Sequence, residues 1–318
     1  MRAVRVTAPR TMEFVNLPDP TAGPGEVLVR LQEIAICGSD LVAYLGTQPR
    51  PYPDRDGRPA HECVGVVVES HLNGYAPGDR VLYFPRHQDG LREYVVADDP
   101  IQLLKLPAEG NISEWMMAQL LGTIIHAARE LGSVMSDKIA VIGQGPVGQL
   151  FNHLMWNLGA HLVIGIDKIP ERLAVSRKMC ATHTLQVGRD DIAAEIGKLT
   201  NGRGVDTVIE ASGYDETLAM MVTIARRDGR VLMFGQPKHL DITFPIMAMY
   251  NKRLKVVTTS GPDVELDIHM ALRYIQDGRI NVKPILTHRF PFERVKEAYD
   301  LFAERRDGCI KVVVEFST

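Results

Sequence analysis

A glycine-rich hexapeptide, GQGPVG at residues 143–148, constrains this chain more than any other stretch. It follows an apolar run at 138–142 and precedes a helix-like pattern, so the sequence predicts a strand, a tight turn and a helix start. The three glycines allow the turn, the close approach of backbone to a pyrophosphate, and tight packing of the helix on the strand, and the helix N-terminus then faces the anion. The predicted dinucleotide contacts in this turn are Gly143, Gly145, Pro146, Val147 and Gly148.

A second apolar run, at 161–166, ends in Asp167, about 20 residues beyond the glycine motif, where a carboxylate meets the adenine-side ribose. Because a carboxylate accepts hydrogen bonds from the ribose hydroxyls but repels a 2′-phosphate, Asp167 favours NAD over NADP. Lys168 and Arg172 soften this preference, and Arg172 is a further candidate cofactor contact. The alternative role for Asp167 is to cap the helix expected to begin near Pro170.

The composition fits a globular protein of two domains. The chain has 318 residues, 45% hydrophobic content, 24% charged content and a formal net charge of −3, which are typical of soluble proteins with a buried core in each domain. It has no basic field that would hold nucleic acid or an anionic membrane. No apolar run of transmembrane length and no leader pattern is present, so we expect a cytoplasmic protein. The four cysteines lack a framework spacing, which favours free thiols or a metal ligand over disulfides.

The first 115 residues have the sequence pattern of a β domain. Short runs rich in β-branched residues alternate with turns rich in glycine and proline, which is typical of a mostly antiparallel sheet. The expected strands are Met1–Thr7, Val27–Ile36, Cys63–Ser70, Arg80–Phe84 and Leu91–Ala97.

From Lys138 to about Thr258, strands alternate with helices, which predicts a doubly wound parallel sheet of about six strands. The tail then carries two helical stretches and a closing strand at 310–316, which we expect to return to the first domain. The predicted fold class is therefore α/β. The expected domains are a mostly antiparallel β domain over 1–118, completed by 263–318, and a Rossmann dinucleotide-binding domain over 119–262.

One group of chemistry-bearing residues falls in the first domain. Cys37 lies between two predicted strands, and His61 and Glu62 come just before the second of them. A thiolate, an imidazole and a carboxylate from two loops make three legs of a tetrahedral zinc site with one open position, where zinc acts as a Lewis acid on an alcohol or carbonyl oxygen. Ser39 is placed to take the hydroxyl proton, and Asp40 to orient a ligand histidine.

Taken singly, these residues have ordinary alternatives. Cys37 alone fits a small buried hydrophobe, His61 a loop histidine with satisfied hydrogen bonds, and Glu62 a solvated charge. Tyr44, a turn beyond Asp40, is either a wall of a substrate pocket or a core residue. The combination with the dinucleotide motif is what favours the metal site.

That combination resembles the zinc-dependent medium-chain alcohol dehydrogenase superfamily, in particular its polyol (sorbitol) and threonine dehydrogenase branch. The resemblance spans the chain from Met1 to about Phe316. It implies a GroES-like catalytic domain, a Rossmann domain, an active site in the cleft between them, and assembly into homodimers or homotetramers. It also implies Cys37, His61 and Glu62 as catalytic zinc ligands and Ser39 as the proton-relay hydroxyl. The motifs that carry the resemblance are CGSDL at 37–41, HE at 61–62, GQGPVG at 143–148, Asp167 and EASG at 210–213.

Two departures from the family pattern matter. Most members carry a lobe of four closely spaced cysteines that holds a structural zinc, whereas here PRHQDG at 85–90 runs straight into the next strand. We therefore expect one catalytic zinc and no structural zinc. In the polyol branch a glutamate seven residues before a His-Ala pair binds the metal or its water, and Gln119 stands there in this chain. An amide is a poor zinc ligand, so either Gln119 or water completes a weaker site, or Gln119 is a helix-face residue.

The sequence thus predicts a zinc- and NAD-dependent dehydrogenase of a secondary alcohol, polyol or sugar-derived hydroxyl. Its expected partner is a small-molecule alcohol or ketone, with neither nucleic acid nor membrane. One alternative is a zinc-free NAD(P)H-dependent reductase of the quinone type, against which the metal-binding residue types count. Another is a non-catalytic nucleotide-binding protein on the same scaffold, which Gln119 alone favours. Fold does not specify the substrate.

Overall fold

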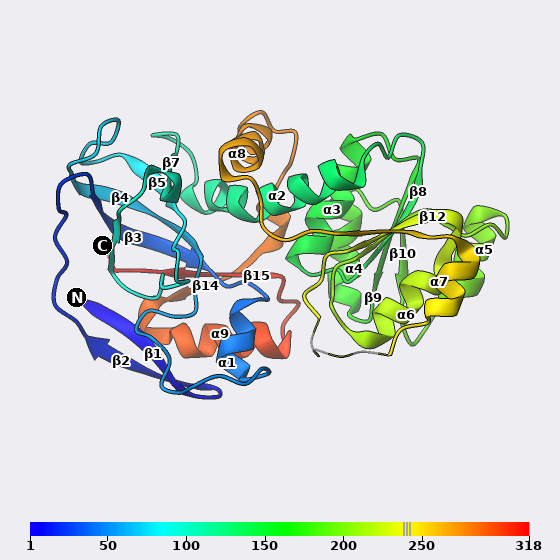
Figure 1. Ribbon diagram of the computed structural model, residues 1–318, viewed down its shortest axis with the longest axis horizontal. Coiled ribbons are helices and arrows are strands. Elements are labelled where there is room, and N and C mark those ends of the chain that lie inside the picture. The colour runs from blue at the N-terminus through cyan, green and yellow to red at the C-terminus, as the bar shows by residue number, and fades with distance from the viewer. Residues whose placement is uncertain (238, 240, 242, 318) are drawn as a thin grey trace. The chain divides into compact units, whose positions relative to one another are not determined.

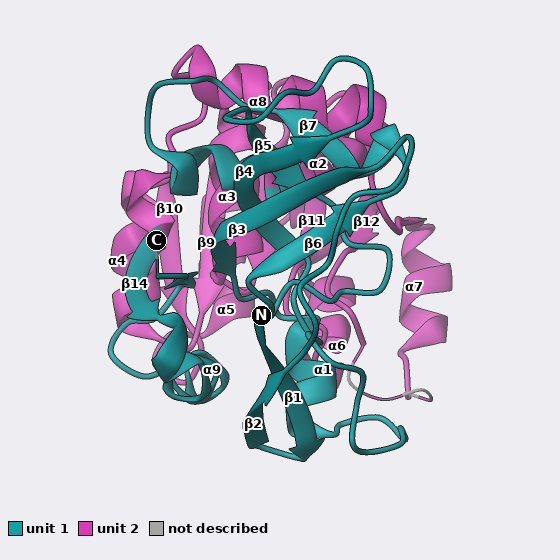
Figure 2. Ribbon diagram, turned by 90° about the vertical axis from the view of Figure 1, so that its left-hand side faces the viewer, with its two compact units in different colours: residues 1–120, 286–318 teal, residues 121–285 magenta. Residues whose placement is uncertain are grey.

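The computed structural model describes residues 1–237, 239, 241 and 243–317, and the chain folds as two compact units (Figures 1 and 2). Unit 1 consists of Met1–Leu120 and Leu286–Thr318, and unit 2 of Leu121–Ile285. Helix α2, Ile112–Leu131, runs from one unit into the other. None of the described helices has the length and apolar character needed to cross a membrane.

The described part of unit 1 is built on a seven-stranded sheet in the order β14-β15-β3-β4-β5-β7, with β6 paired to β3. Its neighbours are antiparallel except for β14 and β15, which are parallel. A separate hairpin, β1 and β2, precedes the sheet. The mostly antiparallel first domain is therefore confirmed. The elements are β1 Arg2–Ala8, β2 Thr11–Asn16, β3 Val27–Ala35, α1 Asp40–Leu45, β4 Glu62–Ser70, β5 Arg80–Tyr83, β6 Tyr94–Ala97, β7 Leu103–Lys105, β14 Leu286–Pro291, α9 Val295–Glu304 and β15 Lys311–Glu315.

The register of three neighbouring strands brings distant segments of the chain together in unit 1. At the end of β3, Ala35 pairs with Glu62 of β4 on one side and with Val313 of β15 on the other. The loop that follows β3 therefore starts between the beginning of β4 and the beginning of β15. The closing strand returns to the first domain, as expected from the sequence.

The described part of unit 2 is a six-stranded, wholly parallel sheet in the order β10-β9-β8-β11-β12-β13, and the predicted doubly wound fold is confirmed. The direction of winding reverses between β8 and β11, and ligands of such sheets bind at the carboxyl ends of the strands at this point. The elements are β8 Lys138–Ile142, α3 Pro146–Asn157, β9 Leu162–Asp167, α4 Pro170–Lys178, β10 His183–Gln186, α5 Ile192–Thr200, β11 Val205–Glu210, α6 Asp215–Ile224, β12 Ala225–Met233, α7 Ile246–Lys252, β13 Lys255–Thr258 and α8 His269–Gln276.

The second boundary between the units differs from the expected one, because residues 263–285 belong to unit 2. A π-helical turn, Val264–Ile268, leads into α8. Within it, the fully buried carboxylate of Asp267 lies 2.8 Å from Nδ1 of His126 and 2.7 Å from Nη1 of Arg129, both on α2. These contacts hold the segment on the part of α2 that belongs to unit 2, so the chain returns to unit 1 only at Leu286.

Candidate metal centre and nucleotide site

A buried carboxylate helps to hold the loop after β3. Asp40, the first residue of α1, is fully buried, and its Oδ2 accepts a hydrogen bond of 2.8 Å from the backbone N–H of Cys37. Its own N–H donates to the carbonyl of Cys37 over 3.2 Å. Cys37 is therefore fixed at its backbone by the residue three positions further along the chain.

The same carboxylate orients His61. Its Oδ1 lies 2.8 Å from Nδ1 of His61, just before β4. In a neutral ring with a carboxylate on Nδ1, that nitrogen carries the proton and Nε2 keeps its lone pair for a metal. Asp40 thus links the Cys37 loop to the imidazole, in the orienting role that the sequence predicted for it.

The structure brings together the three residues that the sequence singled out as metal ligands. One ligand atom each from Cys37, His61 and Glu62 lies within 4.8 Å of the others. Tetrahedral zinc, with bonds of about 2.0 to 2.3 Å, needs ligand atoms about 3.3 to 3.8 Å apart, so the three groups lie close enough for small side-chain movements to bring them onto one ion. One thiolate, one imidazole and one carboxylate form a donor set that suits zinc.

Glu62 takes part in a buried ion pair that sequence reasoning missed. Nζ of Lys311, on β15, lies 2.7 Å from Oε1 of Glu62 and donates to the carbonyl of Ile36 over 3.1 Å. Both charged side chains are completely shielded from solvent. The other oxygen, Oε2, is also buried but accepts no hydrogen bond from any described residue. A divalent cation bound between this carboxylate oxygen, the thiol and the imidazole would supply the partner that the oxygen lacks, so the residues present fit a metal.

The electrostatics of the cluster follow from burial and from its acids. Burial lowers the pKa of His61, but the charge and hydrogen bond of Asp40, together with Cys37, outweigh it and raise that pKa well above its usual value. Burial also lowers the pKa of Lys311, and Glu62 and Cys37 more than restore it, so the ammonium keeps its charge. A metal must therefore displace a proton from the imidazole when it binds.

Two other predicted residues lie in unit 1 without contacts that would test their roles. Ser39 is half-buried at the start of α1, and its hydroxyl forms no hydrogen bond to another described residue. Gln119 is half-buried on α2, and within the described residues it forms no hydrogen bond to Cys37, His61 or Glu62. The proton relay and the amide ligand stay predictions.

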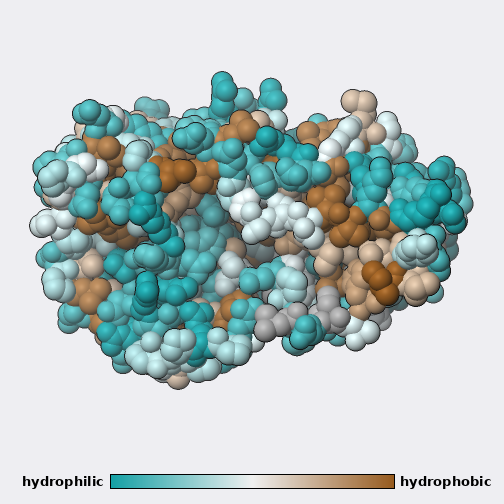
Figure 3. Space-filling model, in the orientation of Figure 1, coloured by the Kyte–Doolittle hydropathy of each residue, from teal (hydrophilic) through white to brown (hydrophobic). Residues whose placement is uncertain are grey.

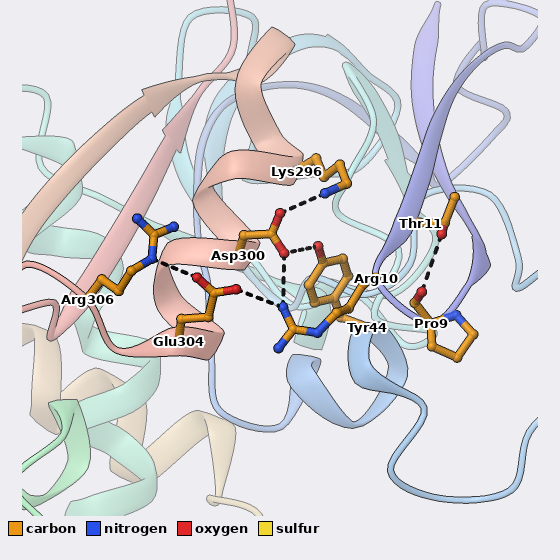
Figure 4. Close-up of polar contacts among 8 residues, drawn as sticks. All are labelled: Pro9, Arg10, Thr11, Tyr44, Lys296, Asp300, Glu304 and Arg306. Atoms are coloured by element: carbon orange, nitrogen blue, oxygen red, sulfur yellow. Dashed lines mark hydrogen bonds and ion pairs between the residues drawn. The ribbon is translucent and has the colours of Figure 1, made fainter.

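Tyr44, for which a pocket wall and a core position were both open, is a core residue. Its ring is fully buried and packs against Tyr299, with ring centroids 5.1 Å apart. Its hydroxyl donates to Asp300 of α9 over 2.7 Å, and the same carboxylate also contacts Lys296 and Arg10 (Figure 4). These contacts use the polar end of Tyr44 to join α1 to α9.

The glycine motif in unit 2 forms the turn between β8 and α3. Gly143 has a φ of +91°, which L side chains rarely adopt. A β-carbon at Gly148 would lie 1.8 Å from the carbonyl oxygen of Gly143, so that position admits no side chain. Helix α3 then begins at Pro146 with Gly145 as its N-cap, and its first N–H groups have no capping side chain. An anion-binding helix start is therefore formed where the sequence predicts one.

Asp167 and Arg172 flank this turn. Asp167, at the end of β9, accepts hydrogen bonds from the backbone N–H of Gln144 at 2.6 Å and of Ile169 at 2.9 Å, one on each oxygen. Each oxygen has a further lone pair for a ribose hydroxyl. Helix α4 has Ile169 as its N-cap and no side-chain cap, so Asp167 does not act as one. Nη1 of the buried Arg172 lies 3.7 Å from where a β-carbon of Gly145 would be.

Comparisons with known proteins identify the family to which both parts of the chain belong. Residues 23–119 match the family model of the alcohol dehydrogenase GroES-like domain, and residues 146–277 match that of the zinc-binding dehydrogenases. The chain is similar to L-threonine 3-dehydrogenase of Bacillus licheniformis, with 33% identity over 337 residues that cover 95% of this chain and 94% of that protein. It is also similar to sorbitol dehydrogenase of Bacillus subtilis, with 26% identity over 99% of this chain and 97% of that protein.

Among solved structures, alcohol dehydrogenase TADH from Thermus sp. ATN1 superposes with a TM-score of 0.86 at 27% identity, and the match covers 100% of both chains. The likeness therefore extends through both units and is not confined to the common dinucleotide-binding fold. With 33% identity to a dehydrogenase over 95% of this chain and 94% of that protein, the chain belongs to the zinc-type medium-chain alcohol dehydrogenase superfamily of oxidoreductases.

Proposed function

We propose that this protein is a zinc- and NAD-dependent dehydrogenase that transfers a hydride between NAD and a secondary alcohol, a polyol or a sugar-derived hydroxyl. The observation that carries the proposal is the cluster of Cys37, His61 and Glu62, in which a buried carboxylate oxygen has no partner. The alternatives without a metal, a quinone-type reductase or a non-catalytic nucleotide-binding protein, give this cluster no role. Its expected partner is a small-molecule alcohol or ketone.

Cys37, His61 and Glu62 would hold the ion, the last through Oε2. When bound, zinc supplies a Lewis acid that polarises the substrate oxygen and eases its deprotonation. Asp40 holds His61 in place, and Lys311 balances part of the negative charge that the ligands bring. Ser39 would take the hydroxyl proton and pass it to solvent, and a bound nicotinamide would supply the acceptor for the hydride of the substrate carbon. A ketone and NADH are formed, and the reverse reaction consumes them.

We propose that unit 2 supplies the cofactor site. The helix start at Pro146 and the backbone of the glycine turn would hold the pyrophosphate, and Val147 lies half-buried in the same turn. Asp167 binds the ribose hydroxyls and favours NAD. Arg172 supplies a positive charge beside the turn, close to where the phosphates pass.

We propose one zinc ion per chain, with water or Gln119 in the remaining coordination position. Cys63 and Cys309 are buried in the apolar core of unit 1 and Cys180 lies in unit 2, which supports a single site. Elemental analysis of the purified protein gives the stoichiometry. Two zinc ions per chain would contradict this part of the proposal.

We propose a homodimer or a homotetramer, with β13 and α7 in the interface. In the described part of the sheet, β13 pairs on one side only. Beside it, α7 buries none of its residues and exposes apolar side chains, with exposed fractions of 57% for Ile246, 64% for Met247 and 74% for Tyr250. Figure 3 shows apolar surface over the region that α7 occupies in Figure 1. An edge strand beside an apolar helix is a surface that a second copy can cover.

Replacing Cys37 tests the function directly. We expect Cys37→Ser to abolish NAD-dependent oxidation of every active substrate in a panel of polyols and amino alcohols. It should lose zinc but still bind NADH, since the cofactor site lies in unit 2. Undiminished turnover in this variant would exclude the metal mechanism and favour a zinc-free reductase. A wild-type protein that binds NADH but neither oxidises this panel nor reduces the corresponding ketones and quinones would favour the non-catalytic alternative.

A further inference from the structure

A group of polar side chains is buried beneath the glycine turn of unit 2, and the proposed chemistry gives it no task. Gln144, Gln149, Asn152 and Ser176 are all completely shielded from solvent. Burying amides and hydroxyls is costly unless they find partners, and apolar residues would fill the same space at lower cost. The position of the group, between the dinucleotide turn and the two helices that follow it, indicates a role in shaping that turn.

The side chain of Gln144 is the centre of the group. Its Oε1 accepts a hydrogen bond of 2.6 Å from Nδ2 of Asn152 on α3, and its Nε2 donates to the carbonyl of Val141 on β8 over 2.8 Å. Ser176 on α4 shares its one hydroxyl proton between Oε1 of Gln144, at 2.7 Å, and the carbonyl of Arg172, at 2.9 Å. One amide therefore joins a strand to both helices around the turn.

The backbone of Gln144 is held as firmly as its side chain. Its carbonyl accepts from Nε2 of Gln149 at 3.1 Å, and the same Nε2 contacts the carbonyl of Arg172 at 2.9 Å. Its N–H is the donor that anchors Oδ2 of Asp167 at 2.6 Å. Gln144, whose N–H anchors the carboxylate of Asp167, is thus itself held through its N–H, its carbonyl and its side chain.

The sequence shows the space reserved for this amide. Gly165 lies in the middle of β9, where a buried parallel strand ordinarily carries a bulky apolar residue. A β-carbon at Gly165 would lie 3.0 Å from both Cδ and Oε1 of Gln144. The glycine therefore leaves room for the Gln144 side chain, which explains an interruption that weakens the strand.

We propose that Gln144, with its donors Asn152 and Ser176, is a set of positioning residues that fixes the Asp167 carboxylate and thereby sets the preference for NAD over NADP. The inference rests on the proposed function, since it assumes that unit 2 binds a dinucleotide. An anchored carboxylate meets the ribose hydroxyls at fixed distances and cannot turn away from a 2′-phosphate, so like-charge repulsion acts in full. When the anchor loosens, contacts to the ribose weaken and repulsion of the phosphate is relieved.

The test perturbs the Gln144 amide in two different ways. Ser176→Ala removes a donor, and Gly165→Ala adds a methyl group that pushes on Cδ and Oε1 of Gln144. Dissociation constants for NADH and NADPH are measured by fluorescence titration at one ionic strength. We expect each variant to weaken NADH about tenfold, as for loss of a well-placed hydrogen bond to a charged group, and to leave NADPH nearly unchanged.

Thr200→Val is the matched control. Thr200 is buried in the same unit, where its hydroxyl donates to the carbonyl of Ile196 over 2.6 Å and accepts from the N–H of Gly204 at 3.0 Å. Its loss costs stability as a buried hydroxyl does, but the ratio of the two dissociation constants should stay within about twofold of wild type.

Equal weakening of NADH and NADPH in Ser176→Ala and Gly165→Ala, or no change in either, would overturn the inference and leave the cluster a purely structural one. Selective NADH binding by the wild type would in that case still support the proposed function. Wild-type protein that binds neither nucleotide would overturn both.

Discussion

The buried ion pair of Lys311 and Glu62 allows a direct test of how charge is balanced at the candidate metal centre of unit 1. Lys311→Met keeps the approximate length of the side chain and removes its charge, so Glu62 loses the ammonium that lies 2.7 Å from its Oε1. Because both side chains are fully buried, water has no access to replace the lost cation. Removing one partner of a buried ion pair costs about 3 to 5 kcal/mol, and we expect the metal-free protein to lose that much of its free energy of unfolding.

Tryptophan fluorescence can follow the unit concerned. The chain has two tryptophans, and Trp115 lies in unit 1 whereas Trp156 lies in unit 2. A Trp156→Phe background therefore leaves one reporter for unit 1. Urea titration in this background, with and without Lys311→Met, measures the unfolding that the argument concerns. A signal averaged over both tryptophans would not isolate the unfolding of unit 1, because the two units need not unfold together.

Lys296→Met is the matched control. Lys296 lies 2.7 Å from Asp300 in the same unit, but 51% of its side chain is exposed. Such pairs contribute less than about 1 kcal/mol. Added zinc should stabilise Lys311→Met more than wild type, because a divalent cation then compensates Glu62 in place of the ammonium. A loss in Lys311→Met no larger than in Lys296→Met would refute the reasoning.

Two further predictions concern the metal and the assembly. Asp40→Asn should weaken zinc binding about 10- to 100-fold, measured by competition with a chelator, because it removes the carboxylate that orients His61; unchanged affinity would mean that the imidazole needs no such support. Tyr250→Glu places a charge on the exposed apolar face of α7, so sedimentation should show a smaller species than for wild type; an identical mass for the two would place the interface elsewhere.

Much of the fold could be predicted because its signals are local. Strands and helices alternate in unit 2 with the expected periods, and the glycine motif marks the first turn. The strands that the sequence did not predict have weak patterns: β2 is largely exposed, β7 has three residues, and β14 has no fully buried residue. The domain boundary near residue 263 could not be found in the same way, because it depends on the contact between Asp267 and residues of α2, which lie far away in the chain.

In the candidate site, too, residues with a local sequence signal could be predicted, and a residue placed only by long-range contacts could not. Cys37, His61 and Glu62 have residue types and neighbours that indicate a metal, and the structure brings them together. Lys311 has no such signal. In the closing strand KVVVE, Lys311 lies on the same face as Val313 and Glu315. Two charged residues on one face indicate that its ends are exposed to solvent, yet Lys311 is fully buried and Glu315 is not. Only the position of β15 beside β3 reveals its partner.

The discontinuity of unit 1 has a consequence for biosynthesis. Cys37, His61 and Glu62 emerge from the ribosome early, but β15, which pairs with β3 and brings Lys311, emerges only after the whole of unit 2. The usual order, in which the N-terminal domain folds first, is therefore reversed for the metal centre. Until the closing strand emerges, the nascent chain carries the thiol of Cys37 and the carboxylate of Glu62 without the ammonium of Lys311, which reaches that carboxylate only when β15 pairs with β3.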